Sequence, residues 1–391
     1  MLDYRAKFVL APMVRIGELP TRLLALKYGA DLVWGPEIID KKLLTCERKY
    51  NEKLKTVDFL SKTGNKKIPG ITDLVFRTYP DLEKDKLVFQ MGTSSPELAV
   101  KAANIVINDV DAIDINAGCP KHFSIHSGMG AALLSTPDLL CNILCDLVTH
   151  VGKPNNKPIS VKIRLLPNKQ DTLKLVSRLV QTGITNLTLH CRTREMRNRE
   201  PPIRDYINEI HDICKNNNVT FIINGQIKNY QQFKNLQEQF GDDVGAMIAS
   251  DAEINPTCFN KEGPLPWYTA IKSYIQFAKT FDNHPANSKY CLARMVPNDK
   301  NKNKIYHLLS KAKTMEEFVD IILNKMDDNG LYIGAQDDAT TMGKTASSTT
   351  NTSKTTAISG GNIDNNQDNS TKRKMNEKTD DIDSSSKKIK V

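Results

Sequence analysis

The sequence has no long apolar run and no recognisable targeting segment. Of its 391 residues, 39% are hydrophobic and 25% are charged. No apolar stretch approaches the roughly 20 residues that cross a bilayer. The opening segment, MLDYRAKFVLAPM, has no apolar signal-peptide core, because strand-like sequence begins within its first few residues. We therefore expect a soluble protein with no membrane partner and no secretory or transit peptide.

Cysteine and histidine are too dispersed for a metal site. The eight cysteines include no C-x-x-C pair and no Cys/His group with zinc-finger spacing. Cys141 and Cys145 share one face of an expected helix, but two ligands make a poor metal site, and core packing explains them better. We expect no metal, and reduced thiols of the kind found in cytoplasmic or nuclear proteins.

Acidic residues are fewer than basic ones in the part of the chain expected to fold. The net charge is +9, and residues 336–391 contribute only +1 of it, from nine Lys/Arg and eight Asp/Glu. The remaining +8 belongs to residues 1–335. A basic body favours a polyanionic partner such as nucleic acid, although a generally basic soluble protein would carry the same charge.

Short apolar segments recur along the first two thirds of the chain and predict strands. Their apolar cores are near-continuous rather than alternating, which is typical of parallel strands covered on both faces. The segments are residues 7–13, 31–37, 86–92, 112–118, 159–165, 186–192, 219–225 and 245–250.

Amphipathic segments separate most of these strands. Ser95, Pro96 and Glu97 offer an N-cap, a first-turn proline and an acidic residue, and segment 171–183 has helical apolar spacing and ends on Gly183. Strands alternating with helices predict an α/β fold, a (β/α)8 TIM barrel over residues 1–261. An open doubly wound sheet is the rival, but its G-x-G-x-x-G loop is missing after the first strand.

Three segments depart from this alternation. Residues 51–85, which contain SKTGNKKIPGITD, predict an exposed insertion, most simply a solvated loop. Residues 262–335 have helical periodicity, with lysines among aromatic residues, and predict a small helical domain.

Residues 336–391 contain no aromatic residue and predict a disordered polar tail. Its basic clusters at 372–374 and 387–390 resemble a nuclear import signal, so we expect cytoplasmic and nuclear localisation.

Polar side chains gather where the predicted strands end. Because the carboxyl ends of barrel strands meet at one mouth, we expect Met13, Gln90, Asn116, Cys119, Lys162, Arg164, His190, Arg192, Asn224 and Ser250 to lie close together. Each alone could be a satisfied core residue, but the whole set is hard to explain that way. An unpaired buried ammonium such as that of Lys162 is costly. The loops after the seventh and eighth strands suit a phosphate, so the set predicts a phosphate-bearing cofactor, with a flavin as one candidate.

Six segments resemble the tRNA-dihydrouridine synthases, and most of all the eukaryotic branch that acts at position 20 of the D-loop. They are LAPMVRIGELPTRLLALKYGADLVWGPEIID, FQMGTSSPELAVKAA, DINAGCPKHFSIHSGMGAALL, VKIRLLP, LTLHCR and IING. The resemblance covers about residues 5–330 and not the tail. It implies a flavin-containing barrel with an appended helical tRNA-binding domain.

The resemblance also implies a role for Cys119. In the family, reduced flavin gives a hydride to one carbon of the uracil double bond, and the cysteine of the N-x-G-C-P motif gives a proton to the next carbon. A thiol near its ordinary pKa is mostly protonated at neutral pH and can act as the acid. Pro120 and Gly118 would fix the loop that presents it. Packing alone is the other interpretation of this cysteine.

Flavin contacts carried over from the family fall on the strand ends. They are Pro12, Met13, Val14, Gln90, Lys162, His190, Asn224, Gly225, Gln226, Ala249 and Ser250. Three positions depart from the family pattern: Cys191 replaces a glycine, Gln226 replaces the second glycine of Asn-Gly-Gly, and Ser250 replaces an arginine. Ser250 brings no positive charge, and Asp251 would repel a phosphate if it faced inward, so these positions put flavin affinity in question.

The expected cofactors are FMN and a nicotinamide reductant, NADPH in preference to NADH, and the expected macromolecular partner is tRNA. The target uracil must leave the tRNA stack to enter the barrel. Arg164 and Arg192 are candidates for its polar edge or nearby phosphates, and Lys272, Lys279, Lys289 and Arg294 for the tRNA backbone. No oligomer is expected. Two alternatives remain open: another FMN barrel such as a dihydroorotate dehydrogenase, or an RNA-binding protein with a decayed flavin site.

Overall fold

The computed structural model describes residues 2–62, 73–297 and 303–333. These residues fall within one compact unit, Met1–Ala335. The predicted tail and both of its basic clusters lie outside the described residues. None of the helices in the described part of the chain combines the length and the apolar character that a membrane span requires.

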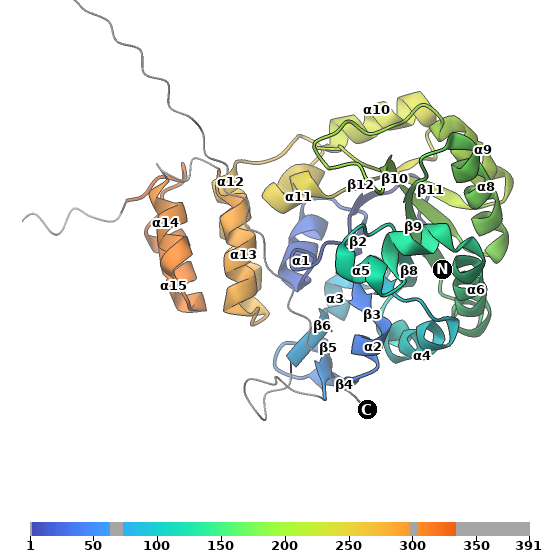
Figure 1. The fold of residues 1–391 in the computed structure, drawn as a ribbon. Coiled ribbons are helices and arrows are strands. Elements are labelled where there is room, and N and C mark those ends of the chain that lie inside the picture. The colour runs from blue at the N-terminus through green and yellow to red at the C-terminus, as the bar shows by residue number, and fades with distance from the viewer. Residues whose placement is uncertain (1, 63–72, 298–302, 334–391) are drawn as a thin grey trace, which may run out of the picture. The chain divides into compact units, whose positions relative to one another are not determined.

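A closed barrel of parallel strands forms the larger part of the molecule (Figure 1). Its strands are β1 (Phe8–Leu10), β2 (Leu32–Trp34), β7 (Leu87–Gly92), β8 (Ala112–Ala117), β9 (Ile159–Leu165), β10 (Asn186–Thr193), β11 (Thr220–Asn224) and β12 (Gly245–Ile248). Each strand pairs with its neighbours in chain order, β1 pairs with β12, and the β2–β7 pairing completes the ring. The predicted TIM barrel and its strands are confirmed.

Both faces of the strands are buried, which explains their near-continuous apolar sequence. In β1, Phe8 and Leu10 belong to the large cluster between strands and helices. The intervening Val9 belongs to a second cluster inside the barrel, with Trp34 and Met247. Because alternate residues of a strand point to opposite faces, a strand covered on both sides needs apolar residues at every position.

Helices surround the barrel. They include α1 (Leu19–Lys27), α4 (Pro96–Val106), α6 (Pro137–Leu147), α8 (Lys169–Leu179), α9 (Ile207–Asn216) and α10 (Tyr230–Phe240). The predicted start of α4 is confirmed: Ser95 Oγ accepts the Leu98 N–H at 3.3 Å, and Pro96 opens the helix. After α8 and a short 3-10 turn, Gly183 adopts a φ of 86°, as a left-handed stop requires.

For the described residues of the segment 51–85, the prediction of a solvated loop is wrong. The segment contains most of a three-stranded antiparallel sheet of β4 (Cys46–Asn51), β5 (Thr56–Ser61) and β6 (Asp73–Thr78). Phe59 and Phe76 are buried beneath it, and Arg77 forms an ion pair with Asp58. Four consecutive residues of β4, Glu47 to Tyr50, are exposed, so this strand lacks the apolar alternation by which a strand is recognised in a sequence. Residues 63–72 lie outside the described residues.

The segment after the barrel is helical, as predicted. It contains α12 (Trp267–Thr280), α13 (Pro285–Met295), α14 (Lys304–Lys311), α15 (Met315–Val319) and the π-helical turn η6 (Asp320–Asn324). Its apolar cluster includes Ile16 and Leu24 from the barrel side, and Tyr28 Oη lies 3.1 Å from Ser273 Oγ of α12. The division between two domains at residues 261 and 262 stays a prediction, because the two parts share this cluster.

Candidate active site

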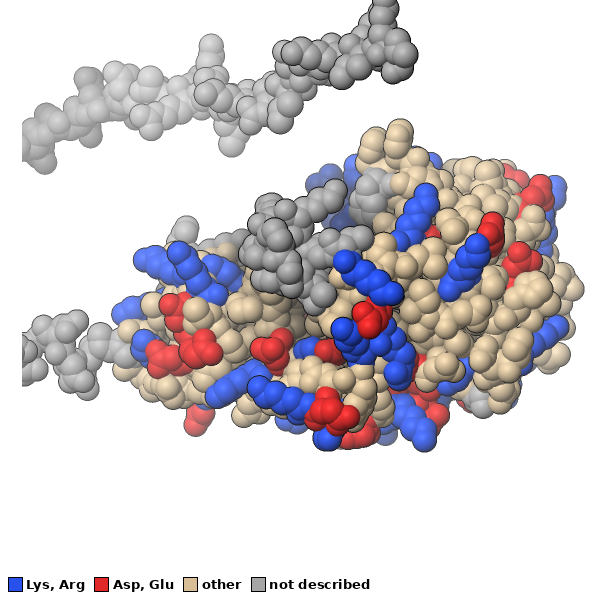
Figure 2. All heavy atoms as spheres, turned by 90° about the horizontal axis from the view of Figure 1, so that it is seen from below, with Lys and Arg blue, Asp and Glu red and all other residues tan. Residues whose placement is uncertain are grey.

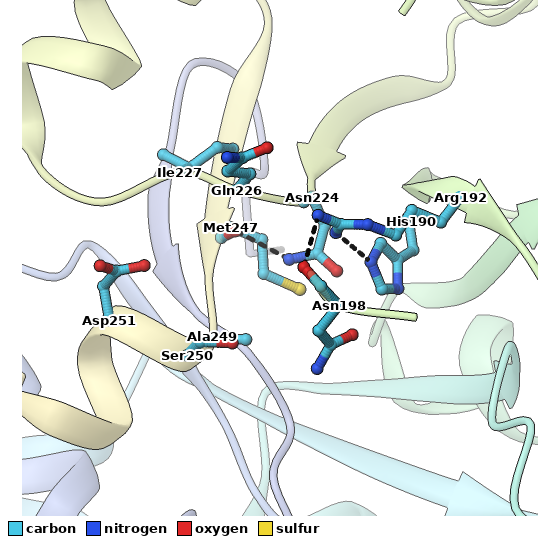
Figure 3. A pocket seen from close by; sticks show the side chains of 11 residues that line it. His190, Arg192, Asn198, Asn224, Gln226, Ile227, Met247, Ala249, Ser250 and Asp251 are labelled. Carbon is cyan, nitrogen blue, oxygen red and sulfur yellow. Dashed lines mark hydrogen bonds between the residues drawn. The ribbon is translucent and has the colours of Figure 1, made fainter. Parts of the chain in front are cut away.

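Two neighbouring pockets open at the carboxyl ends of the barrel strands and share His190. The β11–β12 pocket, drawn in Figure 3, is lined by His190, Arg192, Asn198, Asn224, Gly225, Gln226, Ile227, Met247, Ala249, Ser250 and Asp251. The cysteine pocket is lined by Pro12, Val14, Glu37, Gln90, Asn116, Gly118, Cys119, Pro120, Lys121, Lys162, Arg164 and His190. The structure thus brings nearly all of the predicted cofactor residues together.

The turn after β11 shapes the first pocket. Asn224 donates through Nδ2 to the Met247 carbonyl at 2.9 Å, which ties the ends of β11 and β12 together. Gly225 has a φ of 124°, and a Cβ there would lie 3.3 Å from His190 Cδ2, so a glycine is needed. In the described residues, the backbone N–H groups of Gly225, Gln226 and Ile227 donate to no protein acceptor. They are available to an anion.

His190 is a neutral imidazole with a defined tautomer. Arg192 Nη1 lies 3.1 Å from His190 Nε2. Because arginine can only donate, Nε2 accepts and the ring proton sits on Nδ1. Burial, together with the charges of Lys162 and Arg164, lowers the pKa of His190 to about 2. The ring therefore stays uncharged at physiological pH and offers one donor.

The loop that carries Cys119 is held from both sides. Asn116 Oδ1 accepts the N–H of Gly118 at 3.0 Å and that of Cys119 at 3.1 Å. Arg164 donates to the Gly118 carbonyl at 2.8 Å and to the Thr193 carbonyl at 2.9 Å. Arg164 therefore fixes the loop, and Arg192 similarly donates to the carbonyls of residues 198 and 200. Both arginines already have intramolecular partners, which sequence reasoning did not foresee.

The Cys119 thiol lies half-buried against a tight turn. A Cβ on Gly130 would come within 2.4 Å of Ser124 Oγ and 2.7 Å of the Cys119 carbonyl oxygen. Gly130 also has a φ of 59°, so this position accepts glycine alone without strain. Burial, with a smaller contribution from the Glu37 charge, raises the pKa of the Cys119 thiol. The cysteine is consequently a neutral acid rather than a thiolate nucleophile.

The Lys162 ammonium is buried, and the charge of nearby Asp114 offsets only part of the cost. Burial and the nearby Arg164 lower the pKa of Lys162 to about 8, and its ammonium makes no hydrogen bond within the described part of the chain. Beneath it, Asp114 is fully buried; Gln90 Nε2 donates to one of its oxygens at 2.8 Å and Ser160 Oγ to the other at 2.7 Å. Because Asp114 binds the amide nitrogen of Gln90, the amide oxygen of Gln90 is left for a ligand.

Of the residues that follow β1, two line the cysteine pocket and one packs against the apolar core. Pro12 and Val14 line the cysteine pocket, and Val14 is 54% exposed. Met13 does not line it: the Met13 side chain packs against apolar clusters of the barrel and of the later helices. Its carbonyl accepts the N–H of Gly17 at 2.7 Å. Met13 is therefore placed as a packing residue.

Arg204 brings a positive charge next to Gly225 of the β11–β12 pocket. This residue was not predicted from the sequence. Arg204 Nη2 donates to the Gly225 carbonyl at 2.8 Å, and Arg204 Nε is buried without a partner in the described residues. Ser250 and Asp251 line the pocket itself, and burial raises the pKa of Asp251. Arg204 comes from a loop far from Ser250 in sequence, so no local signal relates them.

The basic residues proposed for the later helices have mixed surroundings. Lys272 pairs with Asp328 at 2.7 Å, and Arg294 pairs with Glu253 of the barrel at 2.6 Å. Lys289 donates to the Ala312 carbonyl at 2.9 Å. Lys279 is exposed, and its ammonium has no hydrogen-bond or ion-pair partner in the described residues, so it is the freest of the four. On the face shown in Figure 2, basic and acidic side chains are interspersed rather than segregated.

Two carboxylates were also missed, one lining the cysteine pocket and one buried in the barrel. Glu37 lies where the second predicted strand ends and lines the cysteine pocket, while Asp114 lies within β8 under Gln90. The position of Glu37 at the end of a predicted strand was a usable signal, whereas Asp114 lies in the middle of its strand. No group of three or more His, Cys, Asp or Glu side chains in the described residues is arranged to hold a metal ion.

Comparison with known proteins places the chain in a family. Residues 9–327 match the family described as dihydrouridine synthase (Dus). The chain is 56% identical over 338 residues to the tRNA-dihydrouridine(20) synthase (NAD(P)+) of Saccharomyces cerevisiae, covering 84% of this chain and 86% of the relative.

Two further relatives are less similar to this chain. The Schizosaccharomyces pombe tRNA-dihydrouridine(20) synthase is 48% identical over 81% of this chain, which spans 65% of that relative. The S. cerevisiae tRNA-dihydrouridine(20a/20b) synthase is 27% identical over 80% of this chain and 77% of its own length. On the extent of the family match and the identity to the first of these relatives, the chain belongs to the dihydrouridine synthase family.

Proposed function

We propose that this chain is a tRNA-dihydrouridine(20) synthase, an oxidoreductase that reduces the C5–C6 double bond of a D-loop uridine with NAD(P)H. The observation that carries the proposal is Cys119, a protonated thiol held at the mouth of a barrel of this family. Identity favours position 20: it is 56% and 48% to the two position-20 enzymes and 27% to the 20a/20b enzyme.

The two pockets fit a flavin mononucleotide. Free N–H groups of Gly225, Gln226 and Ile227, with Arg204 behind them, suit a phosphate. The unpaired ammonium of Lys162 suits an anionic ring, and the free amide oxygen of Gln90 suits a ring N–H. The site therefore has both an anion-binding end and a ring-binding end, with His190 at their junction. When bound, the flavin would supply hydride transfer between the nicotinamide and the uracil.

Cys119 would supply the proton that completes the reduction. The double bond gains a hydride at one carbon and a proton at the other, and the proton comes from the Cys119 thiol. The remaining thiolate regains a proton from solvent before the next turnover. Asn116 and Arg164 hold the loop so that the thiol meets the base at a fixed place.

The reductant and the tRNA would use the same mouth in turn. The sequence has no dinucleotide-binding motif, so the nicotinamide is proposed to stack in the pocket, react and leave before the base enters. By family resemblance we favour NADPH over NADH. We propose that the later helices bind the tRNA backbone, with Lys279 the candidate that has no competing partner, while Lys289 and Arg294 also stabilise the fold.

The proposal is tested with purified protein, NADPH and an unmodified tRNA transcript. Dihydrouridine should appear at position 20 and not at 16, 17, 20a or 20b, and the protein should be yellow. Dihydrouridine at another position would overturn the assignment of position 20. A colourless protein that binds tRNA and forms no dihydrouridine would favour the decayed-site alternative. A U20→C transcript serves as the matched control.

A further inference from the structure

Glu37 is placed over the barrel mouth by the segment that follows β2. After Gly35 and Pro36, the chain forms β3 (Ile38–Ile39), which pairs in parallel with Met91 and Gly92 at the end of β7. A Cβ on Gly92 would lie 2.5 Å from Glu37 Oε1. The glycine therefore leaves room for the Glu37 carboxylate to lie over the end of β7.

This carboxylate has an unused acceptor. Glu37 Oε1 is buried and accepts no hydrogen bond within the described residues. Burial raises the pKa of Glu37, while Asn116 and the charge of Lys121 counteract it. A buried acceptor that lacks a donor is unfavourable, so the arrangement calls for a donor from a ligand.

The other residues that line the cysteine pocket indicate which ligand group would donate to Glu37. Among the described residues that line the cysteine pocket, Glu37 is the only carboxylate, whereas Lys121, Lys162 and Arg164 bring positive charge. Uracil presents two carbonyl oxygens with an N3–H donor between them. Cytosine has a bare N3 acceptor at the same place. A single carboxylate in a cation-rich pocket matches the uracil edge and repels the cytosine edge.

The position of Glu37 beside Cys119 assigns it to the base rather than to the cofactor phosphate. Glu37 and Cys119 line the same pocket, and the Glu37 charge contributes to the raised pKa of the Cys119 thiol. Because the thiol has to meet the uracil double bond, a neighbouring carboxylate lies near the same ring. We infer that Glu37 accepts the N3–H of the flipped uracil and makes the site select uridine over cytidine, an inference that rests on the proposed function.

The experiment uses the full chain as purified, reduced anaerobically with NADPH and mixed with tRNA transcripts carrying U20 or C20. Its readout is the rate at which each transcript reoxidises the protein. In Glu37→Gln, the loss of a charged acceptor should slow U20 by about tenfold to a hundredfold. The U20-to-C20 rate ratio should fall by at least about tenfold, because an amide can donate to cytosine N3. Reduction by NADPH should be unchanged.

Two further variants keep the result interpretable. Gly92→Ala should displace the flexible carboxylate end without removing it, and should lower the same ratio even if Glu37→Gln folds poorly. Glu52→Gln is the matched control, because the Glu52 side chain is 81% exposed; it should behave as wild type.

The outcomes separate this inference from the proposed function. Equal slowing on both transcripts would mean that Glu37 acts only through the Cys119 pKa, and a changed rate of reduction by NADPH would place it on the cofactor; either overturns the inference. Wild-type protein that forms no dihydrouridine at position 20 would instead overturn the proposed function.

Discussion

Replacing Lys162 should stabilise the fold while weakening the site. The pKa of Lys162 falls from an ordinary 10.5 to about 8 because the ammonium is buried and lies near Arg164. One pKa unit corresponds to about 1.4 kcal/mol. Keeping Lys162 protonated therefore costs the ligand-free protein on the order of 3 kcal/mol. Lys162→Met removes that cost and should raise the free energy of unfolding at pH 7 by about 1 to 3 kcal/mol.

The effect has a defined pH dependence. Below pH 8 the lysine is protonated in both the folded and the unfolded protein, so the full cost is present. Between pH 8 and 10.5 the unfolded chain binds more protons, and the stability of the wild type rises with pH. The advantage of Lys162→Met should therefore shrink across this window and vanish above it.

Urea unfolding of flavin-free protein at pH 7 and pH 10 measures the difference. Lys174→Met, at an exposed position on α8, is the matched control and should change little at either pH. Flavin retention should move in the opposite direction, because the variant loses the cation proposed to stabilise the anionic ring, and its reduction by NADPH should be slower. A variant less stable than wild type at pH 7, or a difference independent of pH, would refute the reasoning.

Three other predictions concern single groups of the site. Cys119→Ala should keep the fold, the yellow colour and reduction by NADPH but lose dihydrouridine formation on tRNA; wild-type turnover would end its role as the acid. Arg204→Met should weaken FMN binding by about tenfold in a fluorescence titration, whereas Ser250→Arg should tighten it by restoring a charged contact; unchanged affinity in both would mean that backbone N–H groups suffice. Because the pKa of His190 is lowered to about 2, activity should show no inflection from this histidine between about pH 5 and 8; an inflection lost in His190→Asn would contradict that.

Local sequence was enough to predict the barrel. A strand buried on both faces needs apolar residues at nearly every position, as Phe8, Val9 and Leu10 show, and that signature lies within the strand itself. Helix starts are equally local, because Ser95 and Pro96 act on the turn that follows them. The Cys119 motif is also local: Asn116, three residues away, is the residue that orients its backbone.

Tertiary structure decided which of these groups are free to act. Arg164 looked available for substrate, yet its partners are the carbonyls of Gly118 and Thr193, which are 46 and 29 residues away in the chain. Arg294 likewise pairs with Glu253 on a different part of the fold.

Contacts between distant segments also explain why Glu37 and the three-stranded sheet were not predicted from the sequence. The unpaired oxygen of Glu37 and the room left by Gly92 depend on the pairing of β3 with β7. The sheet of β4, β5 and β6 depends on pairing between strands and on the burial of Phe59 and Phe76. A sequence shows which side chains can donate, accept or carry charge. Whether a partner already occupies them depends on contacts between segments far apart in the chain, and these arise only when the chain folds.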